Sequence, residues 1–527
     1  MTPRPARPVR PSTASARPAS KAPGRLRRAL TRTVLGTLAA AVVATPFVAT
    51  WSYDAHRRAV SEQAPAPAGG SDARPRTPAA RHPSAPVVLA YHDVAPHPHS
   101  RYTVSPERLD AQLSALRATG HRALSTEEFV RYLATGRPPA PRSVYLTFDD
   151  GTRGLWAYAD PILAKHRMKA ATYLITGMVG TRRPYYLTWP EVHRMAGSGR
   201  WDFQAHTHDG HHRAAVDASG RHGSVLANRL WRPGPGRLET EAEYRRRVEA
   251  DLDRSARAFA HQGLPAPRLF AYPFSETGAR TNLAGRNTSV LERLLRARYA
   301  ATLTNTTPRP LPAGPRAAAA GQVRRLEVLR STTPEELLRA VDAWASSTPG
   351  DAPRPLRQPG GWEFPGSPPG TGLAALTGLG SPHRTYVSAV HRPMSTADWS
   401  SYRVTARADG LRGTGTGVSV EVGHGGGYPC TLTVGARGLR VTLRRPDGER
   451  RALATRRLAP SAAHRLTLRT APGTVRVTVD TTSFVVRLPE RATAARTSGG
   501  IALGVRNESP GTPWPRFTSL RVSPGST

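Results

Sequence analysis

Two adjacent carboxylates, Asp149 and Asp150, end an apolar run and are followed by Gly151. Side chains alternate along a strand, so neighbouring aspartates at its end point in different directions and cannot do the same job. Two anions side by side also repel each other unless a cation or a proton lies between them. An Asp-Asp-Gly sequence is equally ordinary in a turn. The pair therefore predicts a metal site with a base beside it only if further ligands follow.

Five candidate metal ligands lie close together further along the chain. They follow another short apolar segment and are His206, His208, Asp209, His211 and His212. Imidazole and carboxylate groups are suitable ligands for zinc, whereas a single histidine would more often be structural. The alternative is a solvated, histidine-rich loop. The only cysteine, Cys430, lies far downstream, which argues against a thiolate site and against a cysteine nucleophile.

The elements that would position these side chains are buried strands. Four apolar runs, at residues 87–91, 144–148, 203–205 and 268–274, are each followed by polar residues. Parallel strands that are buried on both faces have this pattern. A barrel of such strands gathers its chemistry at their carboxyl ends. We therefore expect the aspartate pair and the histidine cluster to meet at one end of a barrel.

Helical signals fall between the apolar runs. Ser105, Ser125 and Thr333 are predicted to begin three helices, and residues 239–262 to form a long charged helix. Residues 213–238, just before that helix, are predicted to be a loop insertion that borders a substrate groove. This alternation predicts the α/β class, with a distorted (β/α) barrel as the catalytic domain.

These motifs jointly resemble a known family. Thr147–Gly151 is similar to the T-F-D-D-G motif of polysaccharide deacetylases (the NodB homology domain, carbohydrate esterase family 4), and Arg268–Pro273 to their R-x-x-x-x-P motif. The spacing of His206 and His211, together with Tyr91-His92-Asp93, is most similar to the poly-N-acetylglucosamine deacetylase branch. The resemblance covers residues 86–345, and its motifs are specific in combination although each alone is weak.

The resemblance implies a set of metal ligands and a base. Asp150, His206 and His211 would bind one divalent metal, with zinc expected and cobalt, nickel or iron as alternatives. Asp149, beside the metal but not bound to it, would be the general base that takes a proton from water. Arg268 would hold Asp149 ionised and oriented through a charge-assisted contact.

The resemblance also implies two further roles. The backbone N–H of Phe274 would stabilise the tetrahedral oxyanion, and His92 would be the general acid that protonates the departing sugar amine. One departure concerns the histidine motif, whose more widespread form has the second ligand one residue earlier, where this chain has Gly210. We therefore assign that ligand to His211, with His208 and His212 as its alternatives.

The predicted activity is the metal-dependent hydrolysis of N-acetyl groups from an extracellular polysaccharide. Poly-β-1,6-N-acetylglucosamine is favoured as the substrate, with peptidoglycan and chitin-like chains as alternatives. A second hypothesis is an esterase that removes O-acetyl groups, whose alkoxide leaving group needs less help from an acid. A third is a catalytically silent protein that binds wall glycan, against which the retained Asp149, metal ligands and Arg268 argue.

Composition sets the context of this activity. The chain has 527 residues, enough for two or three domains, and a formal net charge of +38 with 50 prolines. Nucleic acid is an obvious partner for so basic a protein, but the sequence has no recognition motif for it, and we expect no nucleic-acid binding. A surface that works against an anionic cell envelope accounts for the charge more simply. The sequence leaves the oligomeric state open.

The amino-terminal part predicts export. A basic cytoplasmic segment, residues 1–32, precedes an uncharged stretch at residues 33–53 that is predicted to be a transmembrane signal anchor. The protein would then be a single-pass protein of the cell membrane with its catalytic domain outside. The alternative is secretion after cleavage of a signal peptide. Residues 54–85, rich in proline and alanine, are predicted to be a flexible linker.

The carboxy-terminal part has a different pattern. Residues 346–370 are rich in proline and glycine and are predicted to be a second linker. In residues 371–527, short segments of alternating apolar and polar residues are separated by turns, which predicts an all-β sandwich that loosely resembles jelly-roll domains. It could be a carbohydrate-binding module. Three of its aromatic residues are then either platforms for sugar stacking or core residues: Trp399, Tyr428 and Trp514.

Overall fold

The structure of the protein is a computed structural model. It describes residues 85–278, 281–283, 288–381, 384–446, 448–489, 498–509 and 511–525. Within those ranges, no helix combines the length and the apolar character needed to cross a membrane. The predicted basic segment (1–32) and anchor (33–53) lie outside the described residues, as does the linker (54–85) up to its last residue.

Nine parallel strands form the sheet of the first domain. Eight of them follow one another in space as β14 (Val323–Arg324), β13 (Ala301–Thr304), β12 (Leu269–Ala271), β7 (Trp201–Ala205), β6 (Ala170–Leu174), β5 (Ser143–Asp150), β1 (Val87–Tyr91) and β15 (Leu326–Glu327), and β4 (Arg122–Ala123) also pairs with β5. The two edge strands, β14 and β15, are separated in the chain by the single residue Arg325. The sheet is therefore a nearly closed barrel, which confirms the predicted fold class for this domain.

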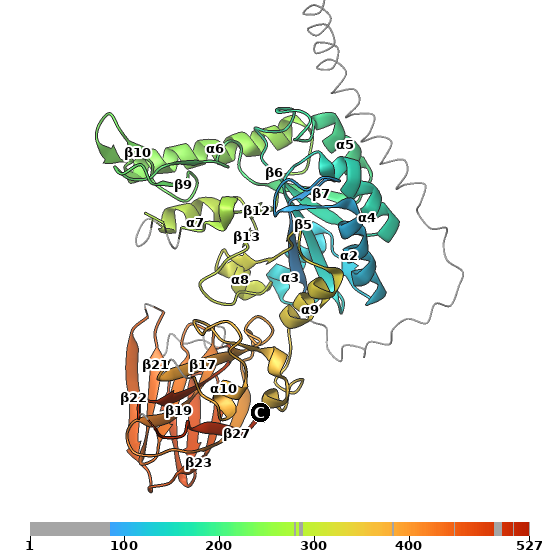
Figure 1. Cartoon of the computed structure of the whole chain (residues 1–527). Helices are drawn as coiled ribbons and strands as arrows, with labels where there is room; N and C mark the ends of the chain where they lie inside the picture. Colours follow the sequence, from blue (N-terminus) through green and yellow to red (C-terminus); the bar gives the residue numbers. More distant parts are fainter. Residues whose placement is uncertain are drawn as a thin grey trace, which may run out of the picture. The chain divides into compact units, whose positions relative to one another are not determined.

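Helices cover the outside of this sheet (Figure 1). They are α2 (Pro106–Ala118), α3 (Thr126–Thr135), α4 (Asp160–His166), α5 (Trp189–Gly197), α6 (Glu241–His261), α7 (Thr288–Arg296), α8 (Pro315–Ala319) and α9 (Pro334–Trp344). Ser105 caps α2, and capping boxes begin α3 at Ser125 and α9 at Thr333, so the three predicted helix starts are confirmed. A π-helical turn, Leu155–Ala159, leads into α4.

The predicted loop insertion contains two short antiparallel hairpins. They are β8 (Arg213–Ala215) with β9 (His222–Ser224), and β10 (Trp231–Arg232) with β11 (Arg237–Leu238). The insertion lies alongside α6 (Figure 1), and Arg247 of that helix donates hydrogen bonds to the carbonyls of Val225 (2.8 Å) and Asn228 (2.9 Å). These contacts fix the insertion against the barrel. One more strand pair, β2 (Asp93–Val94) with β3 (Thr103–Val104), follows β1.

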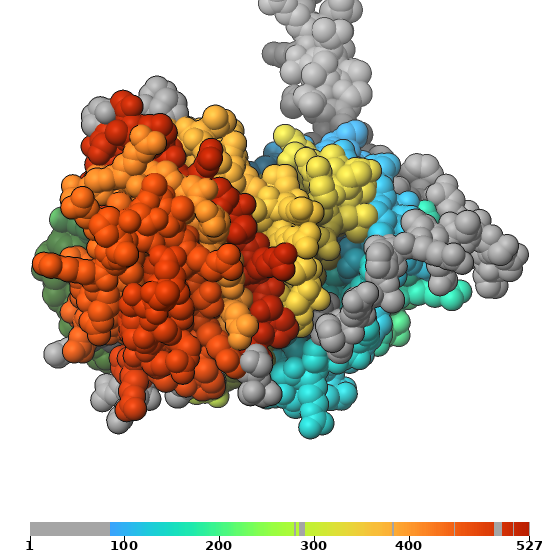
Figure 2. Space-filling model, turned by 90° about the horizontal axis from the view of Figure 1, so that it is seen from below, coloured from blue at the N-terminus to red at the C-terminus, as the bar shows by residue number. Residues whose placement is uncertain are grey.

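The second domain is a sandwich of two antiparallel sheets. One has the order β16 (Trp362–Glu363), β17 (Tyr386–His391), β26 (Gly500–Asn507), β19 (Thr416–His424), β20 (Cys430–Gly435), β21 (Gly438–Arg444) and β22 (Arg450–Arg457). The other has the order β25 (Thr482–Arg487), β24 (Thr474–Val479), β23 (Ala463–Ala471), β18 (Tyr402–Asp409) and β27 (Arg516–Pro524). In the space-filling view these residues, orange to red, gather in one body (Figure 2). The predicted all-β domain is confirmed.

The core between the two sheets contains two of the three aromatic residues proposed as sugar platforms. Trp399 and Tyr428 are buried, and the indole N–H of Trp399 donates a hydrogen bond to the carbonyl of Ser347 (2.7 Å). Trp514 is half-buried and packs against the same core. Trp399 and Tyr428 therefore serve as core residues, because burial removes the exposed ring face that a sugar would need.

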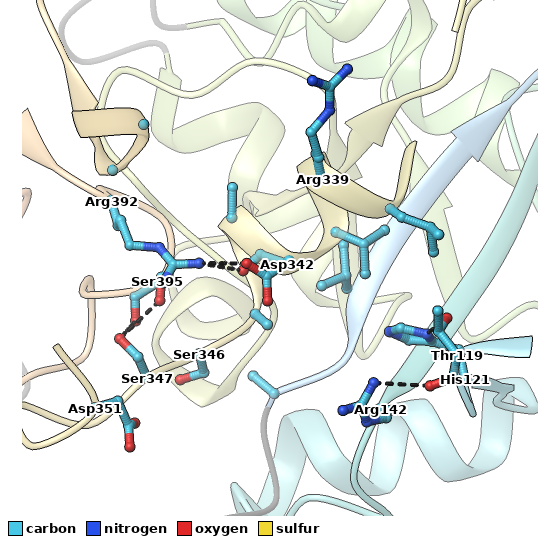
Figure 3. A pocket seen from close by; sticks show the side chains of 18 of the residues that line it. Thr119, His121, Arg142, Arg339, Asp342, Ser346, Ser347, Asp351, Arg392 and Ser395 are labelled. Atoms are coloured by element: carbon cyan, nitrogen blue, oxygen red, sulfur yellow. Dashed lines mark hydrogen bonds and ion pairs between the residues drawn. The ribbon is translucent and has the colours of Figure 1, made fainter. Parts of the chain in front are cut away.

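A cavity of about 860 Å³ lies where the strands β1 and β5 begin, away from the carboxyl ends that carry the predicted chemistry (Figure 3). Arg392 and Asp342 form an ion pair in its wall (2.9 Å), and Arg142 donates to the carbonyl of Thr119 (2.9 Å). The cavity holds none of the predicted site residues.

Candidate metal centre and catalytic site

The chain turns sharply at the end of β5, and this turn separates the two carboxylates. Asp149 is 3% exposed, whereas Asp150, the last residue of β5, and Gly151 have left-handed backbones (φ 73° and 74°). A left-handed conformation is unfavourable for a residue with a side chain, so the surrounding structure must impose it on Asp150. The result is that Asp149 faces the barrel interior while Asp150 faces the loops at the carboxyl end.

Three of the predicted ligands converge. The Nε2 atoms of His206 and His211 lie 3.6 Å and 3.5 Å from Oδ1 of Asp150. One ligand atom from each of the three residues lies within 4.8 Å of the others, which is the spacing a single ion would bridge. His206 directly follows β7, and its backbone N–H continues the parallel pairing by donating to the carbonyl of Leu174 (3.0 Å).

The donor atoms have the chemical state that a divalent metal requires. Nδ1 of His206 lies 2.8 Å from the carbonyl oxygen of Ala271, so this nitrogen carries the proton and Nε2 presents a lone pair toward Asp150. Burial lowers the pKa of His206 to about 4, which keeps the ring neutral near pH 7. Oδ1 of Asp150 is buried and has no hydrogen-bond partner among the described residues. A buried carboxylate oxygen without a partner is costly, so the residues present fit a metal ion.

The two alternative histidines have other partners. Nδ1 of His208 lies 2.9 Å from the hydroxyl of Thr176, and Nδ1 of His212 lies 2.8 Å from the carbonyl oxygen of Asp209. Neither belongs to the converging group with Asp150. The geometry therefore favours His211 over His208 and His212 as the third ligand.

Arg325 holds Asp149. Its two terminal nitrogens donate to the two carboxylate oxygens at 2.7 Å and 2.6 Å, and its Nε donates to Oδ1 of Asn305 at 2.8 Å. Arg325 is 1% exposed, so this bidentate pair is fully buried. Burial alone would raise the pKa of Asp149, but the charge and the hydrogen bonds of Arg325 outweigh burial and hold the pKa below its usual range.

The prediction that Arg268 would hold Asp149 is wrong. Arg268 immediately precedes β12, so it lies at the amino end of a parallel strand, whereas Asp149 lies at the carboxyl end of β5. The side chain of Arg268 is exposed, and its backbone N–H donates to the side chain of Gln204 (2.8 Å). The function that the motif assigned to Arg268 belongs, in this structure, to a residue more than fifty positions later, Arg325.

His92 and Phe274 border the same site. Nε2 of His92 lies 4.0 Å from Oδ2 of Asp149, and its ring packs against that of Tyr102, with centroids 4.7 Å apart. Phe274 has a left-handed backbone (φ 56°), and its ring lies 4.6 Å from the ring of His211. The structure thus brings together six of the seven predicted site residues, all except Arg268. The acid role of His92 and the oxyanion role of the Phe274 N–H stay predictions.

Comparisons with known proteins agree with the motifs. Residues 136–290 match the family model described as polysaccharide deacetylase, which confirms the resemblance. The poly-β-1,6-N-acetyl-D-glucosamine N-deacetylase of Escherichia coli K12 is 26% identical over 205 residues, covering 36% of this chain and 30% of that protein. The enzyme of the same name from Staphylococcus aureus MRSA252 is 34% identical over 113 residues, covering 21% of this chain and 39% of that protein.

Among solved structures, that of IcaB from Ammonifex degensii is similar to this chain. It is 27% identical with a TM-score of 0.38, and the match covers 49% of this chain and 96% of that one. The matches to the N-deacetylases of Escherichia coli and Staphylococcus aureus cover 30% and 39% of those proteins, so this chain spans well under half the length of either.

Proposed function

Because residues 136–290 match the polysaccharide deacetylase family, we propose that this protein is a metal-dependent N-deacetylase of polysaccharides that contain N-acetylglucosamine. One observation carries the proposal: Asp150, His206 and His211 converge on one point beside a buried, ionised Asp149. Amide hydrolysis needs an activated water, a polarised carbonyl and a proton for a poor leaving group, and these residues supply the first two.

The proposed roles follow from the geometry. Asp150, His206 and His211 would hold a divalent ion, zinc by preference, which supplies Lewis-acid polarisation and lowers the pKa of water. Asp149, kept ionised by Arg325, accepts the proton of the attacking water. The amide C–N bond breaks after attack, so the acyl group leaves as acetate and the nitrogen as an amine that must gain a proton.

Two further residues would complete the reaction. We assign the backbone N–H of Phe274 to the oxyanion, because Phe274 borders the proposed metal centre, with its ring 4.6 Å from that of His211. His92 gives a proton to the amine, and its Nε2, 4.0 Å from Asp149, lies where the proton taken from water could be passed on. The test of this assignment is His92→Ala, which should deacetylate much more slowly than wild type.

The proposed substrate is poly-β-1,6-N-acetylglucosamine, because both named relatives carry that polymer in their names. The experiment is acetate release from defined N-acetylglucosamine oligomers with β-1,6 and β-1,4 links, with and without chelator and added zinc. We expect release that chelator abolishes and zinc restores. Activity that resists chelator, or release from O-acetylated but not N-acetylated sugar, would contradict the proposal.

We also propose that the protein is held at the outer face of the cell membrane by residues 33–53. The basic residues before this uncharged stretch and the polysaccharide substrate support export. Full-length protein should then stay in the membrane fraction after an alkaline wash. A soluble, shortened chain outside the cell would instead indicate that a signal peptide is cleaved.

A further inference from the structure

A second cavity adjoins the proposed metal centre, and of its lining residues only Phe274 has a role described above. It has a volume of about 720 Å³. Three segments that are distant in the sequence form its wall: the hairpin of β8 and β9, the segment that follows Phe274, and the segment 306–308 after β13. The hairpin belongs to the insertion that the sequence predicted to border a substrate groove.

Phe274 connects this cavity to the metal centre. Its ring lies 4.6 Å from that of His211 on one side, and the guanidinium of Arg213 lies 4.5 Å from its centroid on the other. The Phe274 side chain is 40% exposed, which is unusual for a large apolar residue beside a polar site. The exposed part of the ring adds apolar surface to the cavity, which the C–H groups of a sugar next to the reacting one can contact.

The wall of the cavity is held in place by the protein itself. Glu276 forms an ion pair with Arg213 (2.7 Å) and accepts hydrogen bonds from the backbone N–H of Ser224 (3.2 Å) and the side-chain amide of Asn228 (3.5 Å). The hairpin and the segment after Phe274 are therefore connected by a carboxylate whose partners are already in place. A polar wall that is fixed before binding is a property of a ligand site.

The charges in the wall are unbalanced. Arg213, Arg221 and Arg324 line the cavity, and among the described lining residues the single carboxylate is Glu276, which is paired with Arg213. Arg221 has its own partner, Asp217 (2.8 Å). The cavity is thus favourable for neutral or anionic groups and unfavourable for an additional cation. Deacetylation changes a neutral acetamide into an amine that is protonated in mildly acidic solution.

We propose that this cavity is a subsite for the sugar next to the one being deacetylated, and that it accepts an N-acetylated neighbour but disfavours a neighbour that already carries a free amine. The inference rests on the proposed function. Its consequence is a product in which free amines are spaced along the polymer, because each deacetylated sugar makes its neighbour a poorer substrate.

The first experiment compares two trisaccharides at pH 6 with the full chain: one fully N-acetylated and one with a free amine beside an N-acetylated sugar. We expect kcat/KM per acetyl group to be about ten-fold lower for the second trisaccharide, because its amine is repelled by the arginines of the cavity. A factor of ten corresponds to a difference of about 1.4 kcal/mol in binding free energy. Arg213→Gln should reduce this discrimination to within about two-fold, because it frees Glu276 to pair with the amine. Arg245→Gln is the matched control, since Arg245 is exposed on α6 and pairs with Glu249 outside the cavity.

The second experiment fills the cavity. Thr306 is exposed at its rim, so Thr306→Trp should lower kcat/KM for the acetylated trisaccharide about ten-fold more than for a single N-acetylglucosamine, since only the longer substrate reaches the subsite. Thr135→Trp, at the exposed end of α3, should keep the wild-type ratio. Circular dichroism and the thermal midpoint report whether each variant is folded.

The outcomes separate the two proposals. Equal kcat/KM for the two trisaccharides in wild type, or an Arg245→Gln effect as large as that of Arg213→Gln, would overturn the subsite while leaving the deacetylase in place. An equal loss on short and long substrates in Thr306→Trp would also overturn it. Absence of acetate release from every substrate would overturn the proposed function, and the subsite with it.

Discussion

Asp149 and Asp150 are neighbours in the chain, yet their surroundings give them different chemistry. Asp149 has a buried guanidinium against both of its oxygens, and Asp150 has two imidazole nitrogens within 3.6 Å and an oxygen without a hydrogen-bond partner among the described residues. A positive partner therefore lies beside the first carboxylate, and a place for a cation lies beside the second. This arrangement relieves the repulsion that the sequence alone presents.

Substituting each aspartate separately tests this division. Asp149→Asn should lower kcat by about 10²–10⁴-fold, the range for loss of a general base, while the protein keeps its metal. Asp150→Asn should weaken metal binding itself, because it removes a ligand. Metal content after dialysis and acetate release measure the two effects. Equal loss of metal in both variants would show that the roles are divided wrongly.

Arg325 should contribute far more than Arg268 to the free energy of unfolding. Arg325→Gln leaves a buried carboxylate without its charged partner, so we expect a loss of about 3–5 kcal/mol in the free energy of unfolding. Arg268→Gln changes an exposed side chain and should stay within about 0.5 kcal/mol of wild type. Urea unfolding of both variants makes the comparison. A larger loss in Arg268→Gln would restore the motif-based assignment.

The depressed pKa of Asp149 predicts how stability depends on pH. Its folded pKa lies below its ordinary value of 3.8, so the stabilisation is complete above that value and is lost as the pH falls toward the folded pKa. The difference in unfolding free energy between wild type and Asp149→Asn should therefore be constant from about pH 8 to pH 5. Below about pH 4, wild type should lose stability relative to the variant, because Asp149 of the wild type becomes protonated. A change centred near neutral pH would contradict the assignment.

The sequence predicted the three residues that converge as a possible metal site, but it missed Arg325. Asp150, His206 and His211 each follow an apolar run, and the parallel topology brings such positions together. Arg325 lies in the segment Val323-Arg324-Arg325-Leu326, which has two adjacent arginines and no run long enough to indicate a strand. Its importance comes from barrel closure, because it is the one residue between the two edge strands, and closure is a property of tertiary structure.

At the scale of elements, the π-helical turn after the aspartate pair packs directly on β2. A Cβ atom on Gly154, which precedes this turn, would lie 2.0 Å from the carbonyl oxygen of Val94 and 2.8 Å from Oδ1 of Asp93. These distances are below any van der Waals contact. The close approach of the two backbones therefore requires glycine, and it fixes the position of the segment that follows the catalytic carboxylates.

Gly154→Ala should lower the free energy of unfolding by about 1–3 kcal/mol, the usual cost of overpacking. Gly197→Ala is the matched control. Gly197 is the last residue of α5 and a Cβ there would meet nothing within 4 Å, so alanine should be neutral or stabilising by up to about 1 kcal/mol. Thermal or urea unfolding gives both values. A tolerated Gly154→Ala would mean that β2 and the turn are not in contact.

Strands with clear alternation were predictable and strands without it were not. In β18, β19, β21, β23 and β24, buried residues alternate with half-buried or exposed ones along much of the strand, which is the pattern that predicted a sandwich in residues 371–527. β22 reads R-R-A-L-A-T-R-R and has no buried residue in its whole length. Such a strand is held by backbone pairing with β21, which leaves no hydrophobic signal in the sequence.

At the scale of the whole molecule, where the formal net charge is +38, the outer face of the five-stranded sheet carries a row of arginines. In one row across the strands, Arg403 lies opposite Arg469, and Arg469 opposite Arg476. Arginines opposite each other on neighbouring strands give this face positive charge, which an anionic surface would attract. A cell envelope is rich in such anions, which agrees with the proposed location outside the membrane.

The double variant Arg403→Gln and Arg476→Gln should therefore elute from a polyanionic matrix at lower salt than wild type, because electrostatic binding is screened by salt. The control is the double variant Arg131→Gln and Arg245→Gln, which also removes two positive charges. These two arginines lie on exposed helix positions and pair with an acidic residue four positions away. If both variants shifted equally, net charge alone would govern binding. A larger shift for the sheet variant, with unchanged acetate release from soluble oligomers, would show that the sandwich contributes an anion-binding face separate from the catalytic site.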